Sequence, residues 1–297
     1  MPQIAHPQTW AEFITACGYW AGNDIVELPE NAVWDMTETP QNGYVDIYPP
    51  EIRGNGTTIK NLHGVFYLMF GTNSRRPVVS GLRFENFETR TTGRGSSFLE
   101  TRGAGAEFYD CKFSGVTGYY SISTFIRGAN NIQPADYLYF NRCSFNFEST
   151  NKTMSPILNS RMKECVVVVS CPNAIKAHYD TASTNIGEYL MSYFEHCELV
   201  VNLPRITKLK LYAKRCTLRG DLTGVTELNV YGMSNADSSQ FMRHDMICVY
   251  DSSSAPNAVL TISSTDPEII PNFVPATTIQ LMNAEYLESI GFPIGGV

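Results

Sequence analysis

The stretch Leu138–Phe145, Leu-Tyr-Phe-Asn-Arg-Cys-Ser-Phe, carries the pattern that decides the fold. Its apolar residues are Leu138, Phe140, Cys143 and Phe145, so apolar and polar residues alternate on either side of the Asn-Arg pair. Alternation with a period of two predicts a β-strand with one buried face. Because two polar residues separate Phe140 from Cys143, the chain has to bend there for both strands to direct their apolar side chains inward.

The same pattern recurs along the chain. If Cys143 is taken as the anchor, position zero, apolar residues recur at positions −5, −3, 0 and +2. The anchors of seven copies are Leu62, Phe87, Cys111, Cys143, Cys165, Cys197 and Cys216, separated by 25, 24, 32, 22, 32 and 19 residues. Bent strand pairs repeated about every 25 residues predict one coil of a parallel β-helix per copy. Helical solenoids would need a 3.6-residue period, and leucine-rich repeats would need their Leu/Asn consensus.

The repeat assigns a place to five of the eight cysteines. Equivalent positions of successive coils stack about 4.8 Å apart, so the anchors are expected to form an interior ladder. Free cysteine packs as a small hydrophobe, which favours core packing over catalysis. His196 is adjacent to Cys197, but neighbouring residues of a strand point apart. We expect reduced thiols and no zinc site, because the chain has no Cys-x-x-Cys pair and its histidines are scattered.

The outward position −2 also shows a pattern. Its residues are Lys60, Glu85, Tyr109, Asn141, Lys163, Glu195 and Lys214. Opposite charges on neighbouring coils stabilise a sheet by a few tenths of a kcal/mol per pair. We therefore expect a solvated outer wall with ion pairs.

The composition excludes several classes of protein. Of 297 residues, 43% are hydrophobic and 17% charged, and the net charge is −7. This balance argues against disorder and against a nucleic-acid partner. The segment Met1–Ala16 lacks a basic stretch followed by an apolar run, and the apolar runs Val65–Phe70 and Cys165–Val169 are far shorter than the ~20 residues that span a bilayer. We expect no secretory signal and no membrane partner, with synthesis in the host cytoplasm.

The ends and loops complete a prediction of one β-helix domain over residues 1–297. Thr9 and Glu12 have capping-box spacing, and an apolar face follows, so a helix within residues 1–20 should cap the first coil. Residues 21–265 are expected to form the stacked coils, although the pattern leaves the register open after Met233. Residues 266–297 are expected to form a C-terminal cap with a short helix from Asn283 to near Gly291. The loops expected to project from the stack are Arg127–Asp136, Pro172–Glu188 and Gly232–Asp245.

The cap segment, the stretch Ile52–Ile59 and the coils that follow resemble the right-handed parallel β-helix, or pectin-lyase-like, superfamily. The resemblance covers roughly Thr9 to Tyr231 and is strongest to tailspike-type virion proteins of bacteriophages. It implies an all-β fold: a single-stranded right-handed parallel β-helix solenoid with a short N-terminal capping helix. The superfamily contains polysaccharide lyases and hydrolases as well as non-catalytic virion and surface proteins, so the fold alone does not define the function.

The catalytic motifs of the superfamily are poorly represented. The Asp-Asp pair and the Gly-His-Gly of its galacturonases are absent, and Leu62-His63-Gly64 is the nearest trace. Asp110, with Glu107 nearby, is the one strand carboxylate that could begin a pectate-lyase calcium set. A glycosidase needs two carboxylates ~5–9.5 Å apart. The pairs open to this role are Glu164 with Glu195, and Glu195 with Glu198.

The favoured hypothesis is a non-enzymatic structural protein of a bacteriophage virion, acting as a β-helical spike, fibre or capsid-attached decoration protein. Its partners would be other virion proteins, further copies of itself (a trimer, as in tailspikes) and surface polysaccharide. We assign no catalytic, cofactor-binding or metal-binding residues and expect no cofactor. Two alternatives stay open. One is a polysaccharide lyase or glycoside hydrolase, acting as a depolymerase on the same scaffold. The other is a glycan-binding module that uses loop aromatics such as Tyr119, Tyr120 and Tyr179.

Overall fold

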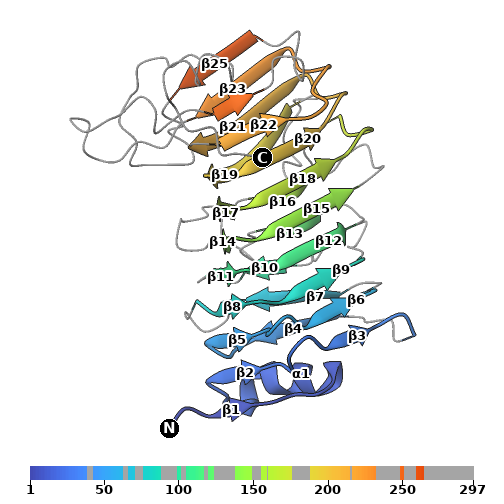
Figure 1. Ribbon diagram of the computed structural model, residues 1–297, viewed down its shortest axis with the longest axis vertical. Helices are drawn as coiled ribbons and strands as arrows, with labels where there is room; N and C mark the ends of the chain where they lie inside the picture. The colour runs from blue at the N-terminus through green and yellow to red at the C-terminus, as the bar shows by residue number, and fades with distance from the viewer. Residues whose placement is uncertain are drawn as a thin grey trace, which may run out of the picture.

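The described residues of the chain form an elongated stack of β-strands with a short α-helix at its N-terminal end (Figure 1). The computed structural model describes residues 1–38, 43–62, 66–70, 76–87, 99–101, 105–116, 120–123, 138–148, 155–158, 160–175, 188–214, 216–231, 248–250 and 259–263. Successive strands lie one above the other along the long axis (Figure 1). The predicted all-β class is confirmed for these residues.

The strands belong to three sheets. The eleven-stranded sheet contains β1 (Ile4–Ala5), β2 (Ile25–Glu27), β5 (Glu51–Arg53), β8 (Val78–Ser80), β11 (Ala106–Tyr109), β14 (Leu138–Asn141), β17 (Ser160–Lys163), β19 (Glu188–Glu195), β21 (Lys208–Lys214), β23 (Glu227–Tyr231) and β25 (Val259–Ser263). The nine-stranded sheet contains β3 (Val33–Asp35), β6 (Thr58–Lys60), β9 (Arg83–Glu85), β12 (Lys112–Val116), β15 (Ser144–Glu148), β18 (Val166–Ser170), β20 (Glu198–Asn202), β22 (Cys216–Arg219) and β24 (Cys248–Tyr250). The five-stranded sheet contains β4 (Gly43–Ile47), β7 (Phe66–Phe70), β10 (Leu99–Thr101), β13 (Tyr120–Ser123) and β16 (Ser155–Leu158).

The chain visits these sheets in rotation. From β2 to β18 each strand of the eleven-stranded sheet is followed by one of the nine-stranded sheet, and where the five-stranded sheet takes part its strand comes next. The strand pairings in the described residues are parallel. From β19 onward the described strands alternate between the eleven- and nine-stranded sheets. Each crossover connection places the next strand beside a parallel neighbour. The order of the strands in each sheet therefore follows their order in the sequence.

The predicted bend between paired strands is confirmed, and it has a specific backbone cause. Between β11 and β12 the chain turns at Asp110, whose φ is +55°, and Cys111 then points inward. The same left-handed conformation recurs at Arg142, Glu164 and His196, with φ between +52° and +54°. One left-handed residue turns the strand direction, which explains why two residues rather than one separate the apolar positions −3 and 0. We call this junction of the eleven- and nine-stranded sheets the cysteine corner.

The first two anchors of the predicted ladder are wrong. Leu62 follows β6 and Phe87 follows β9, so both lie where the nine-stranded sheet ends, one corner further along the coil. Lys112 pairs in register with Arg83, and this places Leu82, not Phe87, in line with Cys111. The prediction confused the two corners of the coil because both have the same local sequence pattern. At each corner a strand is followed by a left-handed residue and then by an apolar residue. At the second corner the left-handed residues are Asn61, Asn86 and Gly115.

The predicted outer wall divides in the same way. Lys60 and Glu85 face each other in register on the nine-stranded sheet, and Lys60 Nζ lies 3.0 Å from Asp35 Oδ2. The remaining five residues of position −2 lie on the eleven-stranded sheet, where Lys163, Glu195 and Lys214 are in register. Alternating charges on adjacent strands are therefore found on two walls rather than one.

The interior of the stack is a continuous apolar core built on phenylalanine. Phe113 lies between Phe84 and Phe145, with ring centroids at 5.5 and 5.1 Å and nearly parallel planes. Phe108 and Phe140 stack at 4.8 Å, and both meet Phe113 edge-on. Stacked and edge-on rings contribute beyond their buried area, so these coils are the most tightly linked part of the core.

The predicted N-terminal helix is confirmed as α1 (Trp10–Cys17), which lies at the N-terminal end of the stack (Figure 1). Thr9 Oγ1 accepts a hydrogen bond from the Glu12 amide at 3.3 Å, as an N-cap residue does. Trp10, Phe13 and Cys17 are buried in the core. The one-turn 3₁₀ helix η1 (Tyr19–Ala21) follows. Within the part of the chain that the structure describes, no helix is long and apolar enough to cross a membrane.

Some predicted features lie outside the described residues. These are the loops Arg127–Asp136 and Gly232–Asp245, most of Pro172–Glu188, the C-terminal cap over residues 266–297 with its helix from Asn283, and the aromatic residues Tyr119 and Tyr179. Tyr120 begins β13, but only its backbone is described.

Candidate functional site

The carboxylates considered for catalysis lie at strand ends around the cysteine corner. Glu195 ends β19 in the eleven-stranded sheet, whereas Glu198 begins β20 in the nine-stranded sheet and forms an ion pair with Arg219. Glu164 occupies the cysteine corner, where its amide donates to the Glu195 carbonyl oxygen at 2.9 Å. Glu195 lines the hollow described below, and Glu164 and Glu198 are not among the residues that line it.

The two carboxylates near β11 are also held in ion pairs. Asp110 Oδ1 and Oδ2 accept hydrogen bonds of 2.8 Å from Arg142 Nε and Nη2, and these bonds lower the pKa of Asp110 below its ordinary value. Glu107 lies 3.2 Å from Arg76 Nη1. No group of three or more His, Cys, Asp or Glu side chains is arranged to hold a metal ion in the residues that the structure describes. The calcium set considered for Asp110 is therefore not assembled from these residues.

A hollow of about 300 Å³ opens on the outer face of the eleven-stranded sheet. It spans four successive strands, β11, β14, β17 and β19, whose side chains alternate between the core and the outside. Phe108, Phe140, Met162 and Phe194 are buried and contribute its floor. The polar and aromatic residues that line it are Arg76, Glu107, Tyr109, Tyr139, Asn141, Arg161, Lys163 and Glu195. We call this site the Tyr139 hollow.

Tyr139 is the centre of the hollow because two arginines are positioned on its ring. The guanidinium carbon of Arg76 lies 4.6 Å from the ring centroid, and that of Arg161 lies 5.6 Å away. Arg161 pairs in register with Tyr139 from the next strand, while Arg76 reaches the ring from the segment before β8. Guanidinium groups stack favourably on aromatic faces, so both arginines are oriented before any ligand binds.

A second set of contacts fixes Glu107 and Tyr109, which line the hollow on β11. Glu107 Oε2 accepts a hydrogen bond of 2.8 Å from the Tyr109 hydroxyl, while Glu107 Oε1 is engaged by Arg76. The hydrogen bond to Glu107 raises the pKa of Tyr109 above its ordinary value, and burial adds to this. Tyr109 therefore stays a neutral donor, and Glu107 is occupied by two partners.

The charged groups of the hollow come from different strands. Its two carboxylates, Glu107 and Glu195, belong to β11 and β19, which are three strand spacings apart in the sheet. Three cationic and two anionic side chains line the hollow, so it offers fixed donors and acceptors around one aromatic ring.

Sequence reasoning missed this site although a signal was present. Only position −2 was compared between coils, whereas position −4 contains Glu107, Tyr139, Arg161, Tyr193 and Tyr212, which are in register in the structure. The contribution of Arg76 had no comparable signal, because it lies before a strand and outside the repeat.

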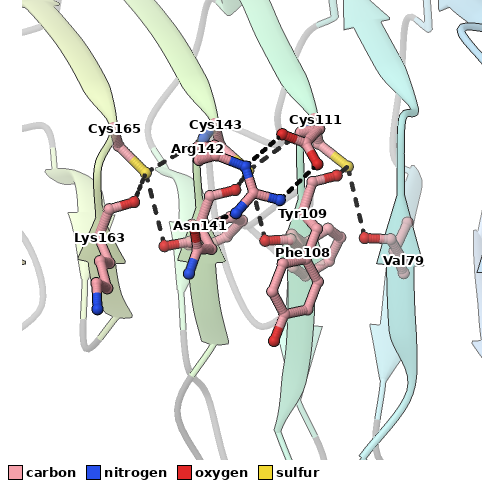
Figure 2. A network of polar contacts seen from close by, with 11 residues as sticks. Val79, Phe108, Tyr109, Cys111, Asn141, Arg142, Cys143, Lys163 and Cys165 are labelled. Carbon is pink, nitrogen blue, oxygen red and sulfur yellow. Dashed lines mark hydrogen bonds and ion pairs between the residues drawn. The ribbon is translucent and has the colours of Figure 1, made fainter.

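The cysteine corner, by contrast, is a structural element (Figure 2). The thiol of Cys143 lies 3.5 Å from the Phe108 carbonyl oxygen and 3.4 Å from that of Asn141. The amide of Cys111 donates to Cys143 Sγ at 3.4 Å, and the amide of Cys143 donates to Cys165 Sγ at 3.4 Å. The sulfurs of Cys143 and Cys165 thus each accept a hydrogen bond from the corner amide of the preceding repeat.

The chemistry of these thiols agrees with core packing. Cys111, Cys143, Cys165, Cys197 and Cys216 are all buried, and none of them forms a disulfide bond. Burial raises the pKa of Cys143 and of Cys197, because a thiolate would lose its hydration there. The backbone of Cys248 pairs in register with that of Cys216, a pairing that the sequence had left unassigned. His196 is exposed while Cys197 is buried, as the alternation predicts.

Comparison of the chain with protein-family models, with curated proteins and with solved structures finds no match.

Proposed function

We propose that the chain is a right-handed parallel β-helix and a non-enzymatic structural protein of a bacteriophage virion, where it serves as a spike, fibre or capsid-attached protein. The rotation of the chain through parallel sheets supports the β-helix, because each complete turn adds one strand to each participating sheet. The elongated core supports a structural role. Its side wall is a rigid surface on which contacts can be presented.

The observation that carries the function is the Tyr139 hollow. It is a shallow, preformed site on a regular sheet, with guanidinium, amide, hydroxyl and carboxylate groups fixed around an aromatic ring. Hydroxyl-rich ligands are recognised by such planar donors and acceptors, and preordered side chains reduce the entropy lost on binding. We infer that the side wall binds a surface glycan there without cleaving it.

The first test is glycan binding by a matched pair of variants. Arg161→Ala removes one guanidinium group from the Tyr139 ring and should weaken binding on a glycan array about tenfold or more, as expected for losing a charged hydrogen-bond donor. Arg219→Ala removes an exposed arginine from the nine-stranded sheet and should bind like wild type. Absence of wild-type binding to any glycan, or equal losses in both variants, would contradict the site.

The second test concerns the virion. Mass spectrometry of particles purified from the phage whose genome encodes this chain should detect it in fixed stoichiometry with the other structural proteins. Its absence from particles would contradict the structural role. Incubation of host glycans with the protein should release no oligosaccharides or unsaturated products. Turnover that Glu195→Gln abolishes would instead support a depolymerase.

A further inference from the structure

The cysteine corner carries unusual residues in its left-handed positions. In the described part of the chain most non-glycine residues with positive φ are Asn or Asp, which tolerate the conformation, and the second corner uses Asn61, Asn86 and Gly115. At the cysteine corner the positions hold Arg142 and Glu164, with φ of +52° and +54°. Long side chains are disfavoured in this conformation by contact between Cβ and the backbone. A role for the side chains themselves would explain their presence.

The corner residues form a line of alternating charge. Asp110, Arg142, Glu164 and His196 occupy the same position in four successive coils, because the strands that precede them are in register. All four side chains are exposed. Their charges run negative, positive, negative and, for protonated histidine, positive. At the beginning of the line, Arg142 donates hydrogen bonds to both carboxylate oxygens of Asp110. Figure 2 shows Arg142 at the cysteine corner, beside Cys143. We call these four residues the corner stripe.

This order of charges is complementary to its own reverse. If a second copy lies antiparallel, with a two-fold axis perpendicular to the stack between Arg142 and Glu164, Arg142 faces Glu164 of the other copy. Asp110 then faces the other copy's His196. A two-fold axis parallel to the stack would instead bring each charge against its own like charge. Attraction between opposite charges therefore favours the antiparallel arrangement. Repulsion between like charges opposes the arrangement in which the axis is parallel to the stack.

An apolar contact is available beside the centre of the stripe. Val166 begins β18, two residues after Glu164, and its side chain is 44% exposed. In the described part of the chain, the other large apolar side chains that are exposed all belong to residues 1–33. In the antiparallel arrangement Val166 comes near its equivalent in the other copy, and the charges surround this contact. An apolar centre with a polar rim is the usual anatomy of a protein interface.

We propose that a second copy of this chain docks antiparallel on the corner stripe and forms a two-fold dimer. The pairing differs from the parallel trimer implied by tailspikes, and it does not depend on the Tyr139 hollow, which lies on the face of the eleven-stranded sheet. Its two chains point in opposite directions, which among the proposed roles favours a capsid-attached protein over a projecting spike or fibre.

The test uses two charge reversals that should fail alone and succeed together. By sedimentation equilibrium at low salt, wild type should be a dimer that weakens as salt is raised. Glu164→Arg and Arg142→Glu should each be monomeric, because each places like charges across the axis. An equimolar mixture of the two variants should form a heterodimer. Positions 142 and 164 are both arginine in Glu164→Arg and both glutamate in Arg142→Glu. Both contacts across the axis would then join opposite charges.

The matched control is Glu148→Arg, the same change at an exposed residue on β15, away from the cysteine corner. This variant should dimerise like wild type. Circular dichroism of each variant reports whether it is folded, and formation of the heterodimer would itself show that both are. A monomeric or trimeric wild type, a dimeric Glu164→Arg, or a mixture that stays monomeric would each overturn the proposal.

Discussion

Replacing Cys165 by Asp is expected to lower the free energy of unfolding by about 3–5 kcal/mol, the effect of an unpaired charge in a core. Cys165 is buried, and its sulfur lies 3.2 Å from the Lys163 carbonyl oxygen and 3.6 Å from that of Phe140. A carboxylate at this place would face two carbonyl oxygens. Urea denaturation followed by circular dichroism would measure the loss as a lower midpoint with an unchanged slope.

Two control variants separate charge from packing at this position. Cys165→Ala removes the sulfur that accepts the Cys143 amide, and it should cost about 1–3 kcal/mol because a buried donor loses its partner. Arg83→Asp places the same carboxylate on an exposed strand residue of the nine-stranded sheet and should change stability by less than about 0.5 kcal/mol. A Cys165→Asp protein that unfolds at the wild-type midpoint would show that the cysteine ladder is not in the core.

Replacing Phe113 by Ala is expected to lower the free energy of unfolding by about 3–5 kcal/mol, the usual range for removal of a buried aromatic ring. Phe113 is fully buried and stacks between Phe84 and Phe145, so its loss leaves a cavity bounded by rings of three coils. The stacked strands are tied together in register, and this limits how far the neighbours can close the cavity. Thermal and urea unfolding of the variant would measure the effect.

The control for Phe113 is an aromatic residue that the fold leaves in solvent. Trp20, in η1, is 93% exposed, and Trp20→Ala should change stability by less than about 0.5 kcal/mol. If Phe113→Ala were as mild as Trp20→Ala, the phenylalanine stack would not be the core of the protein. If both variants were strongly destabilised, Trp20 would make stabilising contacts at the N-terminal end despite its exposure.

Much of the local structure was predictable from the sequence. The alternation around Phe140 and Cys143 predicted two strands and a bend, and the structure adds that the bend is a single left-handed residue. The helix from Trp10 to Cys17 followed from its cap and apolar spacing. These features depend on backbone sterics and on period-two or period-3.6 patterns within about ten residues, which a single sequence contains in full.

The candidate site was less predictable, because its residues come from several coils. Arg76 and Tyr139 are 63 positions apart in the chain but lie within 4.6 Å of each other, guanidinium carbon to ring centroid. Bringing them together depends on the register of β8, β11 and β14, and hence on the lengths of the connections between those strands. In the sequence, a polar residue at an outward position has the same pattern in every strand. The pattern therefore does not show which of these residues meet in the folded protein.

By itself the sequence determined that this chain is all-β, that its strands bend in pairs, and that the cysteines at these bends face inward. Only the tertiary structure decided which corners align, so that Leu82 rather than Phe87 stands in line with Cys111. It also brought Tyr139 between two arginines and set the corner stripe in one line. The physical reason is that strand formation is a local property, whereas parallel stacking selects one register by the core volume and backbone hydrogen bonds of whole coils.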